Sequence, residues 1–283
     1  MMQNTLLKER PASPGARPSR SARAGRLGQG HDLPVFVSDD DYTTQMKQDI
    51  AAAFRRWPLW TRLGWQDIVL RYRRSLLGPL WMTLSLGVMT ITLAAVYTDI
   101  FHAQGTAYLL YLVAGFWVWN LISALFSEGC QTFIEAEWLI RQTDLPLMIF
   151  PLRIVWRNFI IFMHNLLLYL VVVTFSPTPY SWSMLQAIPG LLLILLNGVW
   201  VTVLLGMLSA RFRDLPQVVT SIMQVFFFAT PIIWPVSANA NLLLVQANPF
   251  YSFMELVRAP LVGHTTNLQE WLVAGGMTLA GFI

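Results

Sequence analysis

The sequence predicts an all-helical integral membrane protein, and three observations support this fold class. Of the 283 residues, 55% are hydrophobic and only 12% are charged, whereas a globular domain carries about 25% charged residues. The apolar residues come in long runs, as they do in polytopic membrane proteins. A basic stretch with helical spacing leads directly into the first of these runs.

The first apolar run is preceded by a basic helix and a bend. In residues 65–74 the side chains sort at helical spacing into two faces, Trp65, Ile68, Val69 and Tyr72 on one and Asp67, Arg71 and Arg74 on the other. Gly78 and Pro79 then interrupt the helix, because glycine bends readily and proline fits the first turn of a new helix. The run from Leu80 to Ile100 can cross a hydrocarbon core of about 30 Å. We therefore expect the basic helix to lie on the membrane and to bend at Gly78 into the first span.

Two segments precede this bend. Residues 1–38 are rich in Arg, Ser, Pro, Gly and Ala without an apolar period, so we expect a disordered basic cytoplasmic tail. Residues 39–76 are expected to form amphipathic interfacial helices. The first of these helices has two sides, one with Met46, Ile50, Phe54 and Trp57 and one with Lys47, Asp49, Arg55 and Arg56. A soluble helix packed on a partner is the alternative. The remaining residues, 77–283, form the membrane domain.

Five further apolar runs follow the first span. Four of them are each expected to cross the membrane, at 107–126, 149–175, 185–208 and 218–234. The last run, 271–283, is too short to cross alone. We expect six spans with the last one incomplete, by truncation rather than as a tilted half-helix, since a bilayer leaves no place for a free carboxylate at mid-depth.

The distribution of charge places the N-terminus in the cytoplasm. Thirteen of the nineteen Lys and Arg residues precede residue 75, and the loops on the opposite side carry only Arg258. Positively charged loops stay on the cytoplasmic side. The outer connection, 235–270, is long but apolar, so we expect two short periplasmic re-entrant helices rather than a solvated loop. Because the basic residues flank membrane segments, they indicate contact with membrane lipids and not with nucleic acid.

The sequence lacks the motifs of common catalytic sites. It has no Walker A pattern, no His-Glu-x-x-His and no Gly-x-Ser-x-Gly. Its single cysteine, Cys130, excludes an internal disulfide and a cysteine-based zinc site. We expect no catalytic residue and no metal. His164 lies deep in the third span, where we expect a neutral side chain bonded to a neighbouring helix rather than a functional group.

Three stretches of the chain resemble a known family. The first is DIVLRYRRSLLGPLW at 67–81, the second is ARFRDL at 210–215 with FFFATPIIW at 226–234, and the third is ANPF at 247–250 with Arg258 and Gly263. From about residue 60 to its end, the chain is similar to the permease subunits of polysaccharide-exporting ABC transporters. These subunits move lipid-linked O antigens, capsules and teichoic acids. The tail before residue 40 lies outside the resemblance.

The resemblance implies a transport subunit and not an enzyme, with residues 77–283 as the permease domain. It implies a homodimer in the bacterial inner membrane that pairs with two copies of an ABC ATP-binding subunit. No cofactor is then expected in this chain, because ATP and Mg are bound by the partner subunit. A cytoplasmic helix at about 129–144 would dock on that subunit, although a mere connector is the alternative. The residues expected to couple the two subunits are Glu135, Glu137, Arg141 and Asp144.

On this resemblance two groups of residues would meet a lipid-linked polysaccharide. The headgroup site would contain Arg71, Arg73, Arg74, Gly78 and Pro79. Its arginines would bind the anionic phosphate of the carrier lipid, or would only reach ordinary lipid headgroups. The channel would be lined by the aromatic residues Trp81, Tyr97, Phe226, Phe227, Phe228 and Trp234. Aromatic faces can bind the apolar faces of sugars, while lipid contact or packing is the alternative for any one of them.

Other functions stay open at this point. The nearest is a permease that exports a drug or a small lipid, and neighbouring glycosyltransferase genes would argue against it. A membrane-embedded, glycan-modifying enzyme would work without an ATPase partner, but it needs polar clusters within the spans, which the sequence does not suggest. A structural membrane protein would need neither the basic bend nor the re-entrant helices.

Overall fold

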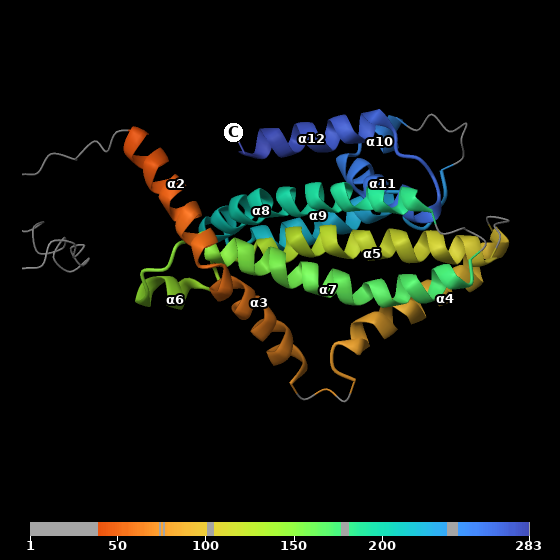
Figure 1. The fold of residues 1–283 in the computed structure, drawn as a ribbon, viewed down its shortest axis with the longest axis horizontal. Coiled ribbons are helices and arrows are strands. Elements are labelled where there is room, and N and C mark those ends of the chain that lie inside the picture. The colour runs from red at the N-terminus through yellow and green to blue at the C-terminus, as the bar shows by residue number, and fades with distance from the viewer. Residues whose placement is uncertain are drawn as a thin grey trace, which may run out of the picture. The chain divides into compact units, whose positions relative to one another are not determined.

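The computed structural model describes residues 39–73, 75, 77–100, 105–176, 181–236 and 243–282. All regular secondary structure in this part of the chain is helical (Figure 1). Residues 48–283 form one compact unit. The expected N-terminal tail, residues 1–38, and the headgroup residue Arg74 lie outside the described residues.

The helices follow one another along the chain with short connections. The described elements are α2 (Asp39–Arg55), α3 (Trp57–Tyr72), α4 (Leu80–Ile100), α5 (Gly105–Gly129), α6 (Glu137–Gln142), α7 (Ile149–Thr174), η1 (Trp182–Gln186), α8 (Ala187–Arg211), α9 (Leu215–Ala229), α10 (Leu243–Gln246), α11 (Pro249–Val262) and α12 (Leu268–Phe282). The long helices α5, α7 and α8 run side by side (Figure 1). Charged residues gather at the ends of these helices, so that each presents a long apolar middle.

Four helices are long and apolar enough to cross a membrane, and they confirm the first four predicted spans. They are α4, α5, α7 and the continuous segment η1–α8, with 21, 25, 26 and 30 residues. A span needs about 20 residues at 1.5 Å per residue. The all-helical, membrane-spanning character predicted from composition therefore holds, with four candidate spans in the described residues.

The fifth and sixth predicted spans are shorter helices. α9 has 15 residues and ends at Ala229, although the predicted run continued to Trp234. The early end has a local cause, since Thr230 is extended (φ −95°, ψ 135°) and precedes Pro231, and a residue before proline disfavours helix. α12 also has 15 residues, which is about 22 Å of helix. A total of six spans thus remains a prediction.

The connection at 235–270 contains two helices in its described part, as predicted from its apolar character. α10 is a single turn. α11 has 14 residues, starts with Pro249 and is capped by the side chain of Asn248. The Oδ1 atom of Asn248 accepts a hydrogen bond from the Phe250 amide (3.0 Å), and Gly263 ends the helix with a left-handed φ of 86°. α11 is almost entirely buried against α5, α8 and α12. Whether these helices re-enter the membrane stays a prediction.

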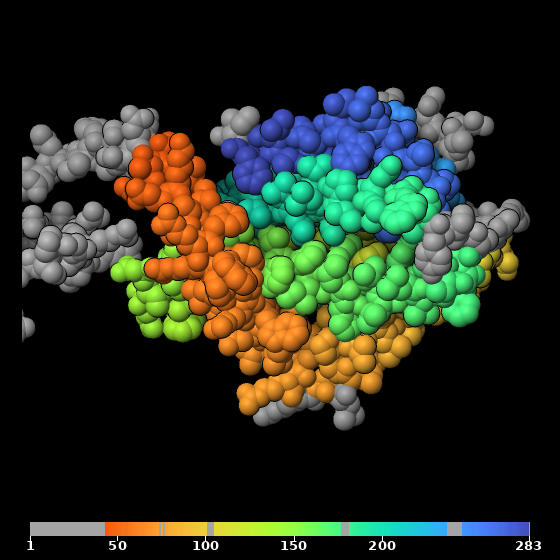
Figure 2. Space-filling model, viewed as in Figure 1, coloured from red at the N-terminus to blue at the C-terminus, as the bar shows by residue number. Residues whose placement is uncertain are grey.

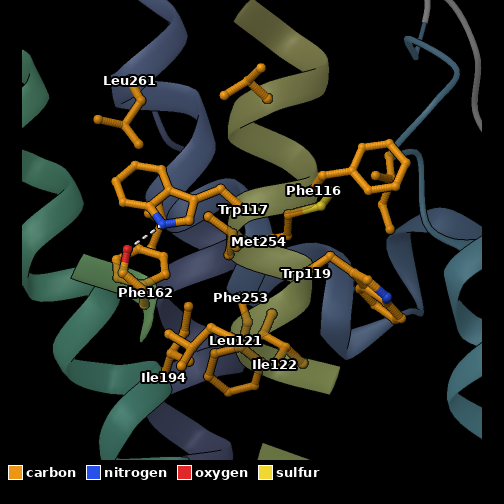
Figure 3. Close-up of a cluster of buried hydrophobic side chains, with 14 of the residues drawn as sticks. Phe116, Trp117, Trp119, Leu121, Ile122, Phe162, Ile194, Phe253, Met254 and Leu261 are labelled. Carbon is orange, nitrogen blue, oxygen red and sulfur yellow. Dashed lines mark hydrogen bonds between the residues drawn. The ribbon is translucent and has the colours of Figure 1, made fainter. Parts of the chain in front are cut away.

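The core of the unit is built around α5, which contacts α4, α7, α8, α9 and α11. At its centre the ring of Trp117 stacks on Phe162 of α7 with 4.3 Å between centroids, and its Nε1 atom donates to the Phe162 carbonyl (2.7 Å) (Figure 3). Met254 of α11 is fully buried in the same cluster. Because α5 is surrounded by the other helices, only a narrow strip of its surface stays uncovered. Part of this strip lines a cavity between α4, α5 and α7.

At one end of the bundle, α3 lies across the beginning of α7, and their surfaces adjoin in Figure 2. Gly64 permits this close approach, since a Cβ atom there would lie 3.1 Å from the Arg153 carbonyl oxygen and from the Trp156 ring. The neighbouring turn is fixed by Asp49 of α2, whose carboxylate accepts hydrogen bonds from the amides of Leu147 and Met148 (both 3.0 Å). Asp49 lies on the charged side of its helix, which was expected to keep to water, but its carboxylate instead binds the turn that leads into α7.

Candidate functional site

A cavity of about 410 Å³ lies where the basic helix α3 ends and the first span begins. Its walls come from α4, α5 and α7, and Arg71 of α3 stands at its mouth. The lining combines apolar side chains with three aromatic rings and six polar or charged groups. The rings are Trp81, Trp117 and Phe162, and the polar or charged groups are Arg71, Ser85, Asn120, Glu128, Asn158 and Asn165. A second cavity of about 170 Å³, between α5, α8 and α11, has an almost wholly apolar lining. The first cavity is therefore the candidate site.

Two of the sequence-predicted site residues meet at this cavity. Arg71 and Trp81 both line it, although the bend separates them along the chain. Arg71 is 46% exposed, and its guanidinium contacts the Glu128 carboxylate at 3.3 Å. A contact of this length between partly exposed groups is weak. Arg71 can therefore release Glu128 and bind instead an anion that enters the cavity.

Behind the mouth, a buried ionic network joins α3, α5 and α7. Asp67 accepts hydrogen bonds from Arg153 (2.6 Å from Nε and 2.5 Å from Nη2) and from Arg157 (3.1 Å). Arg157 and Asn158 both donate to the Oε2 atom of Glu128 at 2.7 Å. Arginines at positions i and i+4 of α7 point the same way, so one carboxylate can receive both. The network fixes the basic helix to the bundle.

The network changes the predicted place of one residue of α3. Asp67 was assigned to the polar face of a helix lying on the membrane, but it is only 14% exposed. Trp65 and Val69 of the apolar face are 56% and 47% exposed. The physical reason is that Arg153 and Arg157 enter an apolar bundle and need partners there. The exposed apolar side of α3 is then left for contact with lipid.

Deeper in the cavity wall, a hydrogen-bond chain joins α4 to α7. The hydroxyl of Thr83 donates to Oδ1 of Asn165 (2.9 Å) and lies 2.9 Å from Nδ1 of His164. The Thr83 hydroxyl thus joins α4 to two neighbouring side chains of α7. The prediction that His164 bonds to a neighbouring helix is thus confirmed.

The remaining polar groups of the lining differ in how many of their hydrogen-bonding atoms already have a partner. The Ser85 hydroxyl donates to the carbonyl of Trp81 in its own helix (2.8 Å). Asn158 uses both amide hydrogens, for Glu128 and for the Ile154 carbonyl (3.1 Å). Asn120 is exposed in the cavity, and within the described part of the chain its amide has no hydrogen-bond partner. The sequence reading did not single out Ser85, Asn120, Asn158 or Asn165, although amides within apolar runs were a usable signal.

The bend before the first span has the predicted form. Gly78 has a left-handed backbone (φ 57°), and its amide donates to the Ser75 hydroxyl (3.2 Å). Pro79 directly precedes α4. Gly78 and Pro79 are half-buried and lie outside the cavity lining, and Arg73 is exposed. Figure 1 shows α3 and α4 as two arms that converge on this bend.

Replacing Gly78 with alanine should cost about 1–2 kcal/mol in the free energy of unfolding, because an L-residue resists the left-handed region. A Cβ atom there would meet no atom within 4 Å, so the loss reports backbone conformation and not a clash. Chemical unfolding in detergent measures the loss. Gly78→Asn should lose less, and Gly275→Ala, equally uncrowded but without a positive φ, should lose nothing. Equal losses for Gly78→Ala and Gly275→Ala would contradict this explanation.

Most of the other predicted channel aromatics pack within the chain. Phe227 lies 5.5 Å from the ring of Phe116, Phe226 lies 4.7 Å from the ring of Phe250, and Tyr97 borders the core. Trp234 is half-buried, and its carbonyl accepts from Tyr111 (3.1 Å). Phe228 is 64% exposed. Packing therefore occupies much of Phe226 and Phe227, while Trp81 and Phe228 keep free ring surface.

The expected coupling helix is shorter than predicted. Residues 130–136 form turns, and only Glu137–Gln142 is helical. Glu135, Glu137, Arg141 and Asp144 are all exposed there, and Arg141 pairs with Glu137 at 2.7 Å. Trp138 is also 61% exposed. Among the described residues, no three His, Cys, Asp or Glu side chains gather as metal ligands.

Comparison with known proteins adds independent findings. The family model described as ABC-2 type transporter matches residues 58–262, from α3 to the last residue of α11. The chain is 25% identical over 214 residues to the O-antigen export system permease protein RfbA of Myxococcus xanthus, which covers 74% of this chain and 82% of that protein. Two proteins with the same name from Klebsiella pneumoniae are 24% identical over 176 and 175 residues, covering 60% of this chain and 66% of each of them.

Proposed function

Because the chain belongs to the ABC-2 type transporter family, we propose that it is the membrane subunit of an ATP-driven exporter of lipid-linked polysaccharide, with O antigen as the first candidate. The proposed direction is outward across the bacterial inner membrane, with the N-terminus in the cytoplasm. Three relatives named as O-antigen export permeases support this choice of substrate. Four apolar helices of spanning length support the membrane location.

One observation carries the proposal, namely that a cationic side chain and an aromatic ring line the same cavity between candidate spans. They are Arg71, near the end of α3, and Trp81, near the start of α4. A lipid-linked glycan presents an anionic phosphate next to a sugar, and these two groups suit a guanidinium and an indole respectively. A purely apolar lipid would give the polar part of the cavity no partner.

The proposed partners are a second copy of this chain and two copies of an ABC ATP-binding subunit. The exposed surface of α6 and its flanking turns, with Glu135, Glu137, Trp138, Arg141 and Asp144, is proposed to dock on the ATP-binding subunit. The ATP-binding subunit, and not this chain, would bind ATP and Mg. An exposed tryptophan between charged residues is typical of an interface centre.

The proposed conduit lies between the two copies. α4 is the least buried of the four candidate spans, and α9 exposes Val218, Ile222, Val225 and Phe228 along one side. These free faces support a role for the first and fifth apolar helices at the junction of the copies. Trp81, Tyr97, Phe226, Phe227, Phe228 and Trp234 keep their proposed role as channel aromatics, with Trp81 and Phe228 offering the most free ring surface.

Transport by the reconstituted complex tests the function. The chain and its ATP-binding subunit are placed in proteoliposomes, and ATP-dependent movement of a fluorescent lipid-linked glycan is measured. Arg71→Gln should lower transport about tenfold or more, since a charge-assisted hydrogen bond contributes about 1.5–3 kcal/mol. Arg62→Gln, on an exposed position of the same helix, is the control and should transport normally. If the wild-type complex showed no ATP-dependent movement of the glycan, the proposed function would be wrong. If Arg71→Gln transported normally, Arg71 would have no role in binding the substrate.

A further inference from the structure

We propose that the cavity between α4, α5 and α7 is a binding subsite for one neutral, hydroxyl-rich sugar unit, placed deeper in the membrane than the phosphate. The inference rests on the proposed function and adds to it a second recognition site within a single copy of the chain. The volume of about 410 Å³ falls within the range of small-molecule pockets, which is roughly 300–1,000 Å³.

The first support is that the polar lining continues inward beyond the charged mouth. Asn120 lies on α5 eight positions before Glu128 (128 − 120), and Asn165 lies on α7 seven positions after Asn158 (165 − 158). These offsets are about 12 Å and 10 Å along the helices at 1.5 Å per residue. The inner groups are amides and a hydroxyl, without a free charge, so the deep part of the cavity suits a neutral polar ligand.

The second support is the set of unused hydrogen-bonding groups. Both donors of Asn158 are engaged, which leaves its Oδ1 atom as an acceptor. Oδ1 of Asn165 accepts from Thr83, and within the described residues its Nδ2 has no acceptor. Asn120 offers both a donor and an acceptor. A sugar hydroxyl both donates and accepts, so neighbouring hydroxyls can match this mixed set.

The third support is the free-energy cost of leaving a buried amide unpaired, because this cost differs between the possible occupants of the cavity. A buried amide without a partner costs about 1–3 kcal/mol in proteins. Asn120 is exposed, so a lipid acyl chain in the cavity would bury its amide without a partner, whereas a hydroxylated ring would hydrogen-bond to it. The observations therefore favour a sugar over a lipid tail.

The rings of the cavity complete the match. Trp81 is 55% exposed at the mouth, and its face is open to a sugar ring. Trp117 forms part of the deep wall, where its Nε1 atom is held by the Phe162 carbonyl and its ring is held by Phe162 (Figure 3). Trp117 therefore contributes a rigid apolar surface and no donor. Aromatic surface with a few convergent amides is the usual composition of a pocket that orients a polar ligand.

Binding of two lipids to the full chain in nanodiscs tests the subsite. The probes are radiolabelled polyprenyl pyrophosphate bearing one N-acetylhexosamine and the same polyprenyl pyrophosphate without a sugar. The wild-type protein should bind the sugar-bearing lipid about tenfold more tightly, which is the size of one or two net hydrogen bonds. Asn120→Leu should abolish this preference and leave the dissociation constant of the bare lipid unchanged.

A matched pair of hydroxyl variants on α4 serves as a second measurement. Ser85 and Thr92 each donate to the carbonyl four positions earlier at 2.8 Å, but only Ser85 lines the cavity. Ser85→Ala should reduce the preference about threefold, and Thr92→Val should leave it intact. Either an equal affinity of the wild-type protein for both lipids or a preference that survives in Asn120→Leu would overturn the subsite.

The same titration separates this inference from the proposed function. Arg71→Gln should weaken the binding of both lipids by the same factor, because it acts on the shared pyrophosphate. If both lipids bind equally well and Arg71→Gln weakens both, the sugar subsite is wrong while the proposed exporter stands. If the wild-type protein binds neither lipid, both the subsite and the proposed substrate class are wrong.

Discussion

Replacing Arg157 with methionine should remove about 3–5 kcal/mol from the free energy of unfolding, as expected when one partner of a buried ion pair is lost. The Arg157 side chain is 8% exposed and bonds to both Asp67 and Glu128. Methionine has a similar apolar stem, so the loss reports mainly the two carboxylates left without this cation. Chemical unfolding of the purified protein in detergent measures the effect.

A double variant distinguishes unpaired charge from simple loss of packing. Glu128→Gln removes the negative charge that faces Arg157 and keeps an oxygen for the Asn158 amide (2.7 Å). Glu128→Gln combined with Arg157→Met should therefore cost less than the sum of the two single changes. The exposed Arg211→Met is the control and should change stability by no more than about 0.5 kcal/mol. Additive losses would show that the network does not act as a unit.

Replacing Arg258 with methionine should also cost about 3–5 kcal/mol in the free energy of unfolding, and its effect should be local to the end of the bundle where α11 lies. The side chain of Arg258 is 2% exposed, pairs with Glu255 and lies 4.3 Å from the centroid of Tyr111. Its Nη1 atom donates to the Pro231 carbonyl (2.6 Å). Hydrogen exchange should show lost protection in residues 230–236 and α11 and unchanged protection at the cavity.

The reason for this local effect is that the segment after α9 has no helical hydrogen bonds of its own. Its carbonyls are satisfied by side chains instead, since Tyr108 donates to Ile233 (2.6 Å) and Tyr111 to Pro231 (2.6 Å). Irregular backbone at membrane depth is tolerated only where protein groups satisfy it. Arg258→Lys should lose less than Arg258→Met. Equal losses would show that the charge of Arg258 is irrelevant.

The sequence predicted the long spans well because their signal is local. A run of about 20 apolar residues must cross the membrane or be buried, whatever its neighbours are, so α4, α5, α7 and α8 could be placed from composition alone. The end of α9 was less predictable. Its apolar run continues to Trp234, but the backbone leaves the helix at Thr230. The irregular backbone that follows is stabilised by hydrogen bonds from side chains of α5 and α11 to its carbonyls.

Helical periodicity separated an apolar from a polar side of α3, but it could not show which residues of each side pack inward. Asp67 of the polar side is 14% exposed and Ile68 of the apolar side is 4% exposed, while Trp65 of that same side is 56% exposed. A helix at a membrane can turn its remaining apolar residues to lipid. The partners of Asp67 lie 86 and 90 positions away on α7. No local pattern contains that information, and the same holds for Asp49 and the start of α7.

The cavity likewise joins residues from three spans and one surface helix. The headgroup residues were predicted from a resemblance, and of these Arg71 reaches the cavity, while Arg73, Gly78 and Pro79 lie outside its lining. The amides of Asn120, Asn158 and Asn165 looked like isolated polar residues in apolar runs. Their common position depends on how α4, α5 and α7 pack around the stacked rings of Trp117 and Phe162.

By itself the sequence determined that this chain is a helical membrane protein whose basic helix bends at Gly78 into the first span. Those features depend on composition, spacing and the conformational freedom of glycine, all of which are local. Only the tertiary structure decided that Arg71, Trp81 and the three amides border one cavity and that Asp67 points inward. The physical reason is that buried charges and amides must find partners, and these partners come from helices that are distant in sequence and adjacent in space.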